Sequence, residues 1–130
     1  MPYRASSGRP RGHIAAFVLA VSAVVGVACG GGDTEESGDA FARGGTLFAN
    51  NCAACHGPAG VGTANGPPLV HVIYEPSHHP DESFHRAVAE GVVAHHWGFG
   101  PMPALPGLDR GEVDDIIAYV RALQREAGIG

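Results

Sequence analysis

The sequence contains no lysine, so all eight basic residues of the 130-residue chain are arginines. It also has no acidic residue before Asp33, although three arginines stand in the first eleven residues. Over residues 29–130, five arginines face thirteen acidic residues, which gives a formal charge of −8. This acidic balance excludes a protein that binds the phosphate backbone of nucleic acids.

The chain also lacks an apolar run long enough to cross a bilayer. The longest run, Ile14 to Ala28, has about fifteen residues, whereas a membrane-spanning helix needs about twenty. It follows an arginine-containing start, which is the order found in an export signal. Residues 1–28 are therefore predicted to be a signal peptide that places the rest of the chain in the periplasm or on another extracytoplasmic face.

Cys29 follows the apolar run directly, after the residues VGVA. The stretch resembles the lipobox of bacterial lipoproteins, although Gly26 stands where leucine is commonest in that motif. The resemblance implies a lipid on Cys29 that anchors the chain to the membrane. Cleavage without lipidation and an uncleaved anchor are the alternatives. Residues 29–40 then predict a flexible acidic linker, and residues 41–130 predict one small folded domain.

The cysteines are few, and their number is odd: three in the whole chain. If Cys29 carries a lipid, Cys52 and Cys55 remain, in the stretch NNCAACHGPAG with His56 directly behind them. A disulfide is one alternative, and a zinc site completed by some of the histidines is another. Cys-x-x-Cys-His is the attachment pattern of haem c. Two thiols add to the two vinyl groups of the haem, and the histidine lies under the iron. The motif therefore predicts one covalent haem c.

With this motif, the sequence resembles the small class I c-type cytochromes of bacteria over about residues 41–124. The resemblance implies an all-α cytochrome c fold, with three to four helices around one haem. It also implies that His56 and Met102 are the ligands of the iron. Met102 is the only methionine besides Met1, and it follows His56 by 46 residues in a proline-rich loop. An ordinary core methionine is the alternative reading of Met102.

The resemblance implies further members of the haem site. A proline carbonyl in such cytochromes, here that of Pro67, accepts the proton of the other nitrogen of the proximal histidine. An ordinary turn proline is the alternative. Leu69 is then expected to pack on the haem face. Trp97 is expected in the haem pocket or the core, and a hydrogen bond from its indole to a haem propionate is a further hypothesis.

The first and last of three expected helices should cross. The first covers about residues 39–54, and the last begins at a D-x-x-E capping box made of Asp109 and Glu112. In class I cytochromes a small residue of one helix packs against an aromatic of the other. The side chains that fit this crossing are Gly44 and Phe48 against Tyr119 or Leu123.

A middle helix is expected near residues 80–96. Pro80 and the acidic residues after it suit a first helical turn. The apolar stripe of this helix would consist of Phe84, Val88, Val92 and His95. The loop that follows would then carry Met102 to the iron.

The function that this resemblance implies is electron transfer. An iron bound by histidine and methionine has no open position for a substrate, so the chain is expected to be an electron carrier and not an enzyme. Its expected partners are redox proteins such as a quinol-oxidising complex and a terminal oxidase or reductase. Many soluble cytochromes dock through a ring of lysines. The lack of lysine and the acidic charge predict instead a partner surface that is basic or largely apolar.

Six histidines have no part in this interpretation. They are His71, His78, His79, His85, His95 and His96. Surface or helix-capping positions are the first interpretation. A second site for copper or zinc is another, which would make the chain a metal-binding module. If Met102 does not bind, an open iron could make the chain a haem enzyme or sensor, and His95 or His96 could replace Met102 as a ligand.

Overall fold

A computed structural model of the chain describes residues 32–130, with side chains from residue 38 onward. The predicted signal peptide 1–28 and Cys29 lie outside the described residues. Across 32–130 the chain forms helices and loops, with no strand in that range. The elements are α1 (Gly32–Asn51), α2 (Ala53–His56), the 3-10 helices η1 (Pro58–Gly60) and η2 (Val72–Tyr74), α3 (Asp81–Glu90) and α4 (Arg110–Glu126). None of the helices in this part of the chain is long and apolar enough to span a membrane.

Helix α1 begins at Gly32, earlier than the start near residue 39 that the sequence predicts. The described end of the predicted linker, residues 32–40, is therefore helical. Extending an existing helix adds one hydrogen bond per residue without repeating the costly nucleation step, which favours this extension. At its other end α1 stops at Asn51, and α2 follows after Cys52, so the predicted first helix consists of two pieces.

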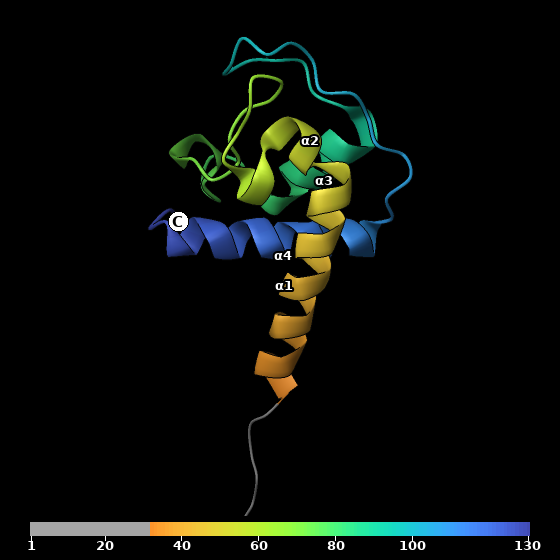
Figure 1. Ribbon diagram of the computed structural model, residues 1–130, viewed down its shortest axis with the longest axis vertical. Helices are drawn as coiled ribbons and strands as arrows, with labels where there is room; N and C mark the ends of the chain where they lie inside the picture. Colours follow the sequence, from red (N-terminus) through yellow and green to blue (C-terminus); the bar gives the residue numbers. More distant parts are fainter. Residues whose placement is uncertain (1–31) are drawn as a thin grey trace, which may run out of the picture.

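Helices α1 and α4 cross, as Figure 1 shows, and Gly44 lies at the crossing. A Cβ atom added to Gly44 would collide with the backbone carbonyl of Asp115 and lie 2.9 Å from the Cβ atom of Tyr119. Phe48, which is 1% exposed, packs with its ring centroid 5.5 Å from that of Tyr119. The predicted crossing is confirmed, with Tyr119 as the aromatic partner.

Helix α4 supplies most of the buried core. Its start has the predicted capping box: Asp109 Oδ1 accepts from the Glu112 amide, and Glu112 Oε2 accepts from the Asp109 amide, both at 2.9 Å. The buried apolar side chains are Phe48 of α1 and Val113, Ile116, Ile117 and Val120 of α4. Burying a side chain of this size stabilises the fold by about 1.5–3 kcal/mol.

Helix α3 is shorter than the sequence predicts. It ends at Glu90, and Gly91 has a φ of 79°, a conformation that residues with a side chain rarely adopt. A Cβ atom on Gly91 would lie 2.6 Å from the carbonyl oxygen of Met102. Val92 and Met102 exchange backbone hydrogen bonds of 3.0 and 2.9 Å. The prediction that the helix continues through Val92 and His95 is therefore wrong, because the chain turns at Gly91 to pair with the Met102 segment.

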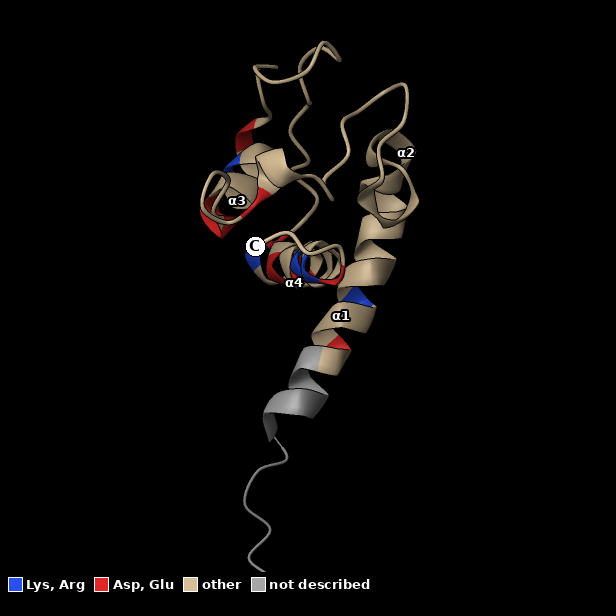
Figure 2. Ribbon diagram, turned by 90° about the vertical axis from the view of Figure 1, so that its left-hand side faces the viewer, with Lys and Arg blue, Asp and Glu red and all other residues tan. Residues whose placement is uncertain are grey.

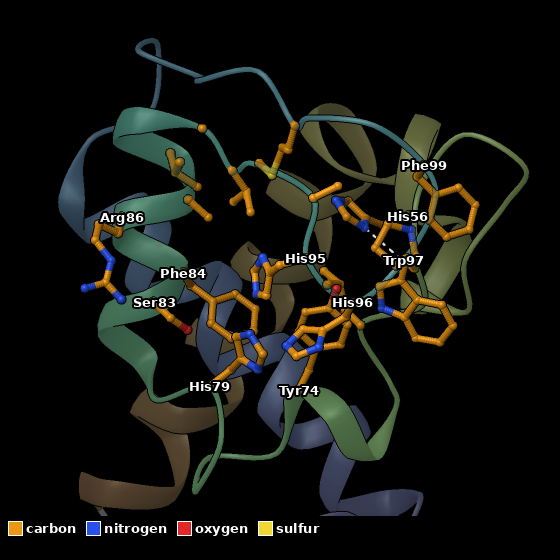
Figure 3. Close-up of a pocket in the computed structure, with 18 of the residues that line it drawn as sticks. His56, Tyr74, His79, Ser83, Phe84, Arg86, His95, His96, Trp97 and Phe99 are labelled. Atoms are coloured by element: carbon orange, nitrogen blue, oxygen red, sulfur yellow. Dashed lines mark hydrogen bonds between the residues drawn. The ribbon is translucent and has the colours of Figure 1, made fainter.

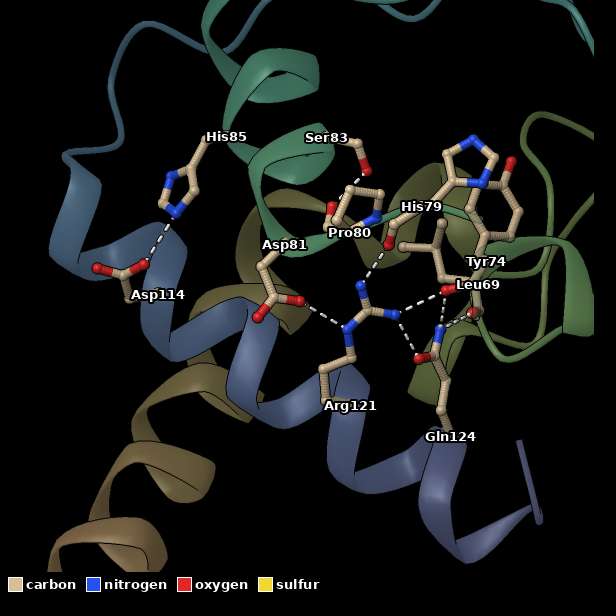
Figure 4. Close-up of polar contacts among 10 residues, drawn as sticks. All are labelled: Leu69, Tyr74, His79, Pro80, Asp81, Ser83, His85, Asp114, Arg121 and Gln124. Carbon is tan, nitrogen blue, oxygen red and sulfur yellow. Dashed lines mark hydrogen bonds and ion pairs between the residues drawn. The ribbon is translucent and has the colours of Figure 1, made fainter. Parts of the chain in front are cut away.

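Two buried polar residues of α4, Arg121 and Gln124, hold the segment before α3 against α4 (Figure 4). Both side chains donate hydrogen bonds to this segment, and Gln124 Oε1 also accepts from Arg121 at 2.7 Å. The acceptors are the carbonyl oxygens of Leu69, Tyr74 and His79 and the carboxylate of Asp81, at 2.5–3.0 Å. Long irregular segments otherwise leave backbone groups unpaired, so these contacts fix the loop that forms one wall of the site.

Candidate functional site

A cavity of about 470 Å³ lies among α2, α3 and the loop that follows α3. This is within the usual range for sites that enclose small molecules and cofactors. Its lining is mostly apolar, and only Arg86 and Glu90 among the lining residues are arginine or acidic. The predicted site residues that line it are Cys52, His56, Pro67, Leu69, Trp97 and Met102. Cys55 is not among the lining residues, and its side chain is exposed.

The stretch CAACH folds into one tight turn at the end of α1. The amides of Cys55 and His56 both donate to the carbonyl of Cys52, at 3.1 and 2.9 Å. Gly66 packs against the turn, where an added Cβ would lie 2.9 Å from the Cys55 carbonyl oxygen. Thr63 Oγ1 donates to that same oxygen at 2.5 Å. The turn therefore presents two cysteines and a histidine from a well-fixed backbone.

Neither cysteine of this turn forms a disulfide, so both thiols are available to attach a group. Burial, followed by the nearby Cys55, raises the pKa of Cys52 to about 11. Cys52 therefore stays protonated near neutral pH, which makes it a poor nucleophile and a poor site for ordinary thiolate chemistry. It does not resemble the activated cysteine of a thiol enzyme.

His56 is oriented by the loop that follows the turn. Its Nδ1 atom lies 2.9 Å from the carbonyl oxygen of Pro67, the contact that the resemblance implies. A carbonyl can only accept, so Nδ1 carries the proton and Nε2 keeps a free lone pair. This is the usual arrangement of a histidine that binds a metal through its other nitrogen.

Met102 reaches the same cavity from the loop 91–108. Its backbone pairs with Val92 just beyond α3, and its side chain is half-buried among the lining residues. The positive φ of Gly91 permits this close approach of the two segments. A short piece of paired backbone therefore fixes a methionine within an otherwise irregular loop.

Trp97 contributes a buried donor to the cavity. Among residues 38–130, its indole Nε1 is the one buried side-chain polar atom that has no hydrogen-bond partner. Burial raises the pKa of Tyr74 and the nearby indole of Trp97 opposes this rise, but the two groups do not meet in hydrogen-bond geometry. An unpartnered donor in a cavity indicates an acceptor on a bound group.

The histidines divide into two sets. His71 Nδ1 accepts from the Ile73 amide at 3.2 Å, and His85 pairs with Asp114 at 2.8 Å, so both have structural roles. Three of the others line one end of the cavity: His79, His95 and His96 lie together in Figure 3, apart from His56 in that view. Desolvation, followed by the neighbouring imidazoles, lowers the pKa of His96.

His79 belongs to the same end of the cavity. Burial is the largest cause that lowers its pKa, ahead of the charges of its neighbours. Tyr74 lines the cavity too, and no sequence pattern marks it, since it is a single aromatic residue at the end of the short helix η2. The sequence drew attention to the histidine pairs but could not place them together, because 18 positions separate His78 from His96.

These residues fit a covalently attached haem. The CAACH turn carries two free thiols, the Nε2 atom of its histidine is free to bind, and an unpartnered donor and a methionine line the same cavity. The alternative of a zinc site on the cysteines lacks support. In the described region, the potential metal ligands that lie close enough together to hold one ion are His78, His79 and His96. Neither cysteine is among them.

Comparisons with known proteins agree with this geometry. No curated protein matches the chain. The structure is similar to the crystal structure of the c-type cytochrome XoxG from Methylobacterium extorquens AM1, with 26% sequence identity and a TM-score of 0.52. The match covers 70% of this chain and 53% of the XoxG chain, so this chain spans about half of that structure's length. The Cytochrome c family matches residues 41–124, which include the CAACH turn and Met102. The chain therefore belongs to the cytochrome c family and takes one covalently attached haem c as its cofactor.

Proposed function

We propose that this chain is a monohaem electron carrier in which His56 and Met102 ligate the iron. Family membership supports an electron carrier rather than an enzyme. The observation that carries the choice of ligands is that both side chains line one cavity, with His56 Nδ1 already bonded to Pro67. An imidazole and a thioether together complete a six-coordinate haem iron.

The residues around the cavity determine what such a cofactor does. When bound, the haem supplies an iron that gains or loses one electron. A neutral thioether from Met102 favours the ferrous state and raises the reduction potential. The apolar lining acts in the same direction, because the additional charge of the ferric state is costly in a poorly solvated cavity. With both positions filled, no place is left for a substrate.

Trp97 holds a polar group of the cofactor in this proposal. Its indole N–H is buried without a partner in the part of the chain that the structure describes. Haem carries carboxylate side chains, and a buried carboxylate needs donors. Donation from Trp97 to one of them satisfies both groups and supports the hypothesis of an indole–propionate hydrogen bond.

The loop 91–108 is the surface that we propose for contact with redox partners. It contains no Asp, Glu, Lys or Arg, and Figure 2 shows the coloured charged residues mainly on the helices. Val93 is 83% exposed and Phe99 40% exposed, and both residues also line the cavity. These features favour a largely apolar contact with a quinol-oxidising complex or a terminal oxidase or reductase. The association rate should then change little with ionic strength, and a steep dependence would argue for a basic partner surface.

We also propose that residues 1–28 direct export and that a lipid on Cys29 holds the carrier at the extracytoplasmic face of the membrane. The support is the sequence pattern alone, because these residues lie outside the described range. Mass spectrometry of the mature N-terminus tests both points. A lipidated N-terminal Cys29, with release of the Cys29→Ser variant from membranes, is the expected result. An unmodified mature N-terminus after Cys29 would contradict the lipid anchor.

The absorption spectrum of protein matured with haem in a bacterial periplasm tests the ligands. We expect ferric protein to show the weak red band of methionine sulfur on iron. The Met102→Ala variant should lose it. A matched control is Phe99→Leu, which changes a lining residue of the same loop and should keep the band.

Two results would contradict the ligand assignment. Wild-type protein without the band, whose ferrous form readily takes up carbon monoxide, would indicate an open iron and favour an enzyme or a sensor. If instead the band is absent and the His95→Ala or His96→Ala variant changes the ferric spectrum, a histidine ligates the iron in place of Met102.

A further inference from the structure

Among the described residues, four histidines remain without a role once His56 is assigned to the haem site and His71 and His85 to structure. They come from two separate segments: His78 and His79 from the turn before α3, and His95 and His96 from the loop after it. Their rings are close together, with centroids 4.3 Å apart for His95 and His96 and 5.2 Å for both His78–His96 and His79–His96. The two segments meet only through the tertiary fold, so the cluster is not a consequence of sequence neighbours.

The ligand atoms within this cluster have the spacing of a metal site. One ring nitrogen from each of His78, His79 and His96 lies within 4.8 Å of the others. The Nε2 atoms of His78 and His96 are 3.3 Å apart. Two imidazole nitrogens at about 2.0–2.1 Å from a tetrahedral ion lie about 3.3 Å from each other. The pair is therefore already spaced for a shared ion, and a ring nitrogen of His79 lies within 4.8 Å of both.

The free nitrogen of His79 points to the same conclusion. Its Nδ1 atom lies 2.6 Å from the carbonyl oxygen of Ile73 and must carry the proton that it donates. Its Nε2 atom then keeps the lone pair. A backbone carbonyl that accepts from the far nitrogen is the usual support of a metal-binding histidine, and His56 has the same arrangement with Pro67.

The turn that carries the first two histidines is held rigidly. The amides of His78 and His79 donate to the carbonyl of Glu75 at 3.0 and 2.8 Å. Buried Arg121 donates to the carbonyl oxygen of His79 at 2.5 Å (Figure 4). Because this backbone is already fixed, metal binding would cost little free energy for ordering the turn. Mainly the loop that carries His96 would have to adjust.

We propose that His78, His79 and His96 bind one divalent transition-metal ion, zinc or copper, at a site separate from the haem iron. Three neutral imidazoles suit both ions, and the remaining coordination position is open to water. The 3.3 Å contact between His78 and His96 is, without metal, one imidazole donating to the other. When the ion binds, the proton of the donating imidazole moves from Nε2 to Nδ1, so both rings stay neutral and both Nε2 atoms face the ion.

Metal titration of the haem-loaded protein tests this proposal, with protein that carries no polyhistidine tag. Zn²⁺ and Cu²⁺ are each added alone, in competition with a chromogenic chelator. We expect one ion per chain in addition to the haem iron. The variants His78→Ala, His79→Gln and His96→Ala should each lower the affinity by about 10- to 100-fold or more.

His85→Ala is the matched control, because it removes a histidine outside the cluster and should leave the affinity unchanged. Circular dichroism and the haem spectrum show whether each variant is folded. With Cu²⁺, nitrogen hyperfine splitting in the paramagnetic resonance spectrum should appear in wild-type protein and weaken in folded His78→Ala.

Three results would overturn the proposal. One is that neither ion binds stoichiometrically to folded wild-type protein. Another is that the ions bind equally well to the folded His78→Ala/His96→Ala double variant. The third is that no ion binds while His96→Ala alters the ferric haem spectrum, which would assign His96 to the haem iron. The first two results do not depend on whether Met102 is the sixth ligand of the haem, whereas the third would also contradict that ligand assignment.

Discussion

The Nδ1 atom of His56 lies 2.9 Å from the carbonyl oxygen of Pro67, eleven residues further along the chain. This contact joins the CAACH turn to the loop that folds back over it. The same loop donates the Gly62 amide to the carbonyl of His56, so the histidine is held through both its side chain and its backbone. The loop therefore determines the ring orientation and the tautomer of His56 as much as the CAACH motif does.

Replacing Pro67 tests what this loop contributes to the cofactor. Pro67→Ala keeps the carbonyl but frees the backbone that positions it. A weaker hydrogen bond makes the histidine a less basic ligand, which destabilises the ferric state. We expect the reduction potential to rise by about 20–60 mV, which is the net free energy of one hydrogen bond expressed as a one-electron potential.

Redox titration of the holoprotein measures this shift. Pro76→Ala is the control, since it frees the backbone at an exposed loop position that does not line the cavity and should leave the potential nearly unchanged. A potential that stays constant in Pro67→Ala, or that shifts equally in both variants, would show that the loop does not tune the ligand through this carbonyl.

Gly44 tests the crossing of α1 and α4. Alanine in a helix is intrinsically better than glycine by about 0.5–1 kcal/mol. At this position, however, the new Cβ atom meets the backbone of Asp115, which cannot rotate away. We expect Gly44→Ala to lower the free energy of unfolding by about 1–3 kcal/mol, as measured by urea unfolding of the holoprotein.

Gly38 provides the control on the same helix. A Cβ atom there meets nothing within 4 Å, so Gly38→Ala should stabilise the protein by about 0.5–1 kcal/mol. Opposite signs for the two variants would support the close approach at Gly44. If both variants stabilise the protein, the helices do not touch at Gly44 as described.

Gln124 is a polar residue that is only 1% exposed, and it stabilises the fold through its hydrogen bonds. It donates to the carbonyl oxygens of Leu69 and Tyr74, at 2.8 and 3.0 Å, and accepts from Arg121. Gln124→Met preserves the volume but leaves a buried carbonyl and part of a guanidinium without a partner. We expect a loss of about 2–4 kcal/mol in the free energy of unfolding.

Arg125→Met, at the exposed neighbouring position of α4, is the control for that measurement and should change stability by less than about 0.5 kcal/mol. A Gln124→Met variant as stable as the control would mean that water or Arg121 alone satisfies the carbonyls. The network would then not be needed to hold the loop before α3.

Much of the site follows from short sequence patterns, because its chemistry is local. The close approach at Gly44 is set by Asp115 on another helix, and the family resemblance predicts it. The CAACH turn and the capping box at Asp109 each have a physical cause within a few residues. The end of α3 at Gly91 does not, because it depends on the Met102 segment, which is remote in the sequence. The meeting of His78 with His96 is equally nonlocal, so the sequence could raise a second metal site only as an alternative.

The ion pair between Arg43 and Asp115 lies beside the Gly44 crossing and gives a prediction about pH. Arg43 donates to both carboxylate oxygens of Asp115, at 2.7 and 3.0 Å. These hydrogen bonds, with the guanidinium charge, lower the pKa of Asp115 below its usual 3.8, against a smaller opposing effect of burial. In the window between the two values the unfolded chain binds more protons, so stability rises with pH there.

The ion pair therefore stabilises the fold fully above the pKa that Asp115 has in the unfolded chain. This stabilisation is lost as the pH falls through the lower pKa that Asp115 has in the folded protein. The Arg43 side chain is 56% exposed, which limits the effect by solvent screening. We expect Asp115→Asn to lower the free energy of unfolding by about 0.3–1 kcal/mol at pH 7. The difference from wild type should shrink below about pH 4, as the unfolded and then the folded carboxyl take up protons.

Urea unfolding of the holoprotein at several pH values checks this, with Glu126→Gln as a surface control that should show no such pH-dependent difference. Added salt should reduce the Asp115→Asn effect at pH 7, because it screens the partly exposed pair. A difference that persists unchanged as the pH falls well below 4 would have to come from packing at the crossing, because the stabilisation by the charged carboxyl diminishes as the unfolded chain binds protons more readily than the folded one.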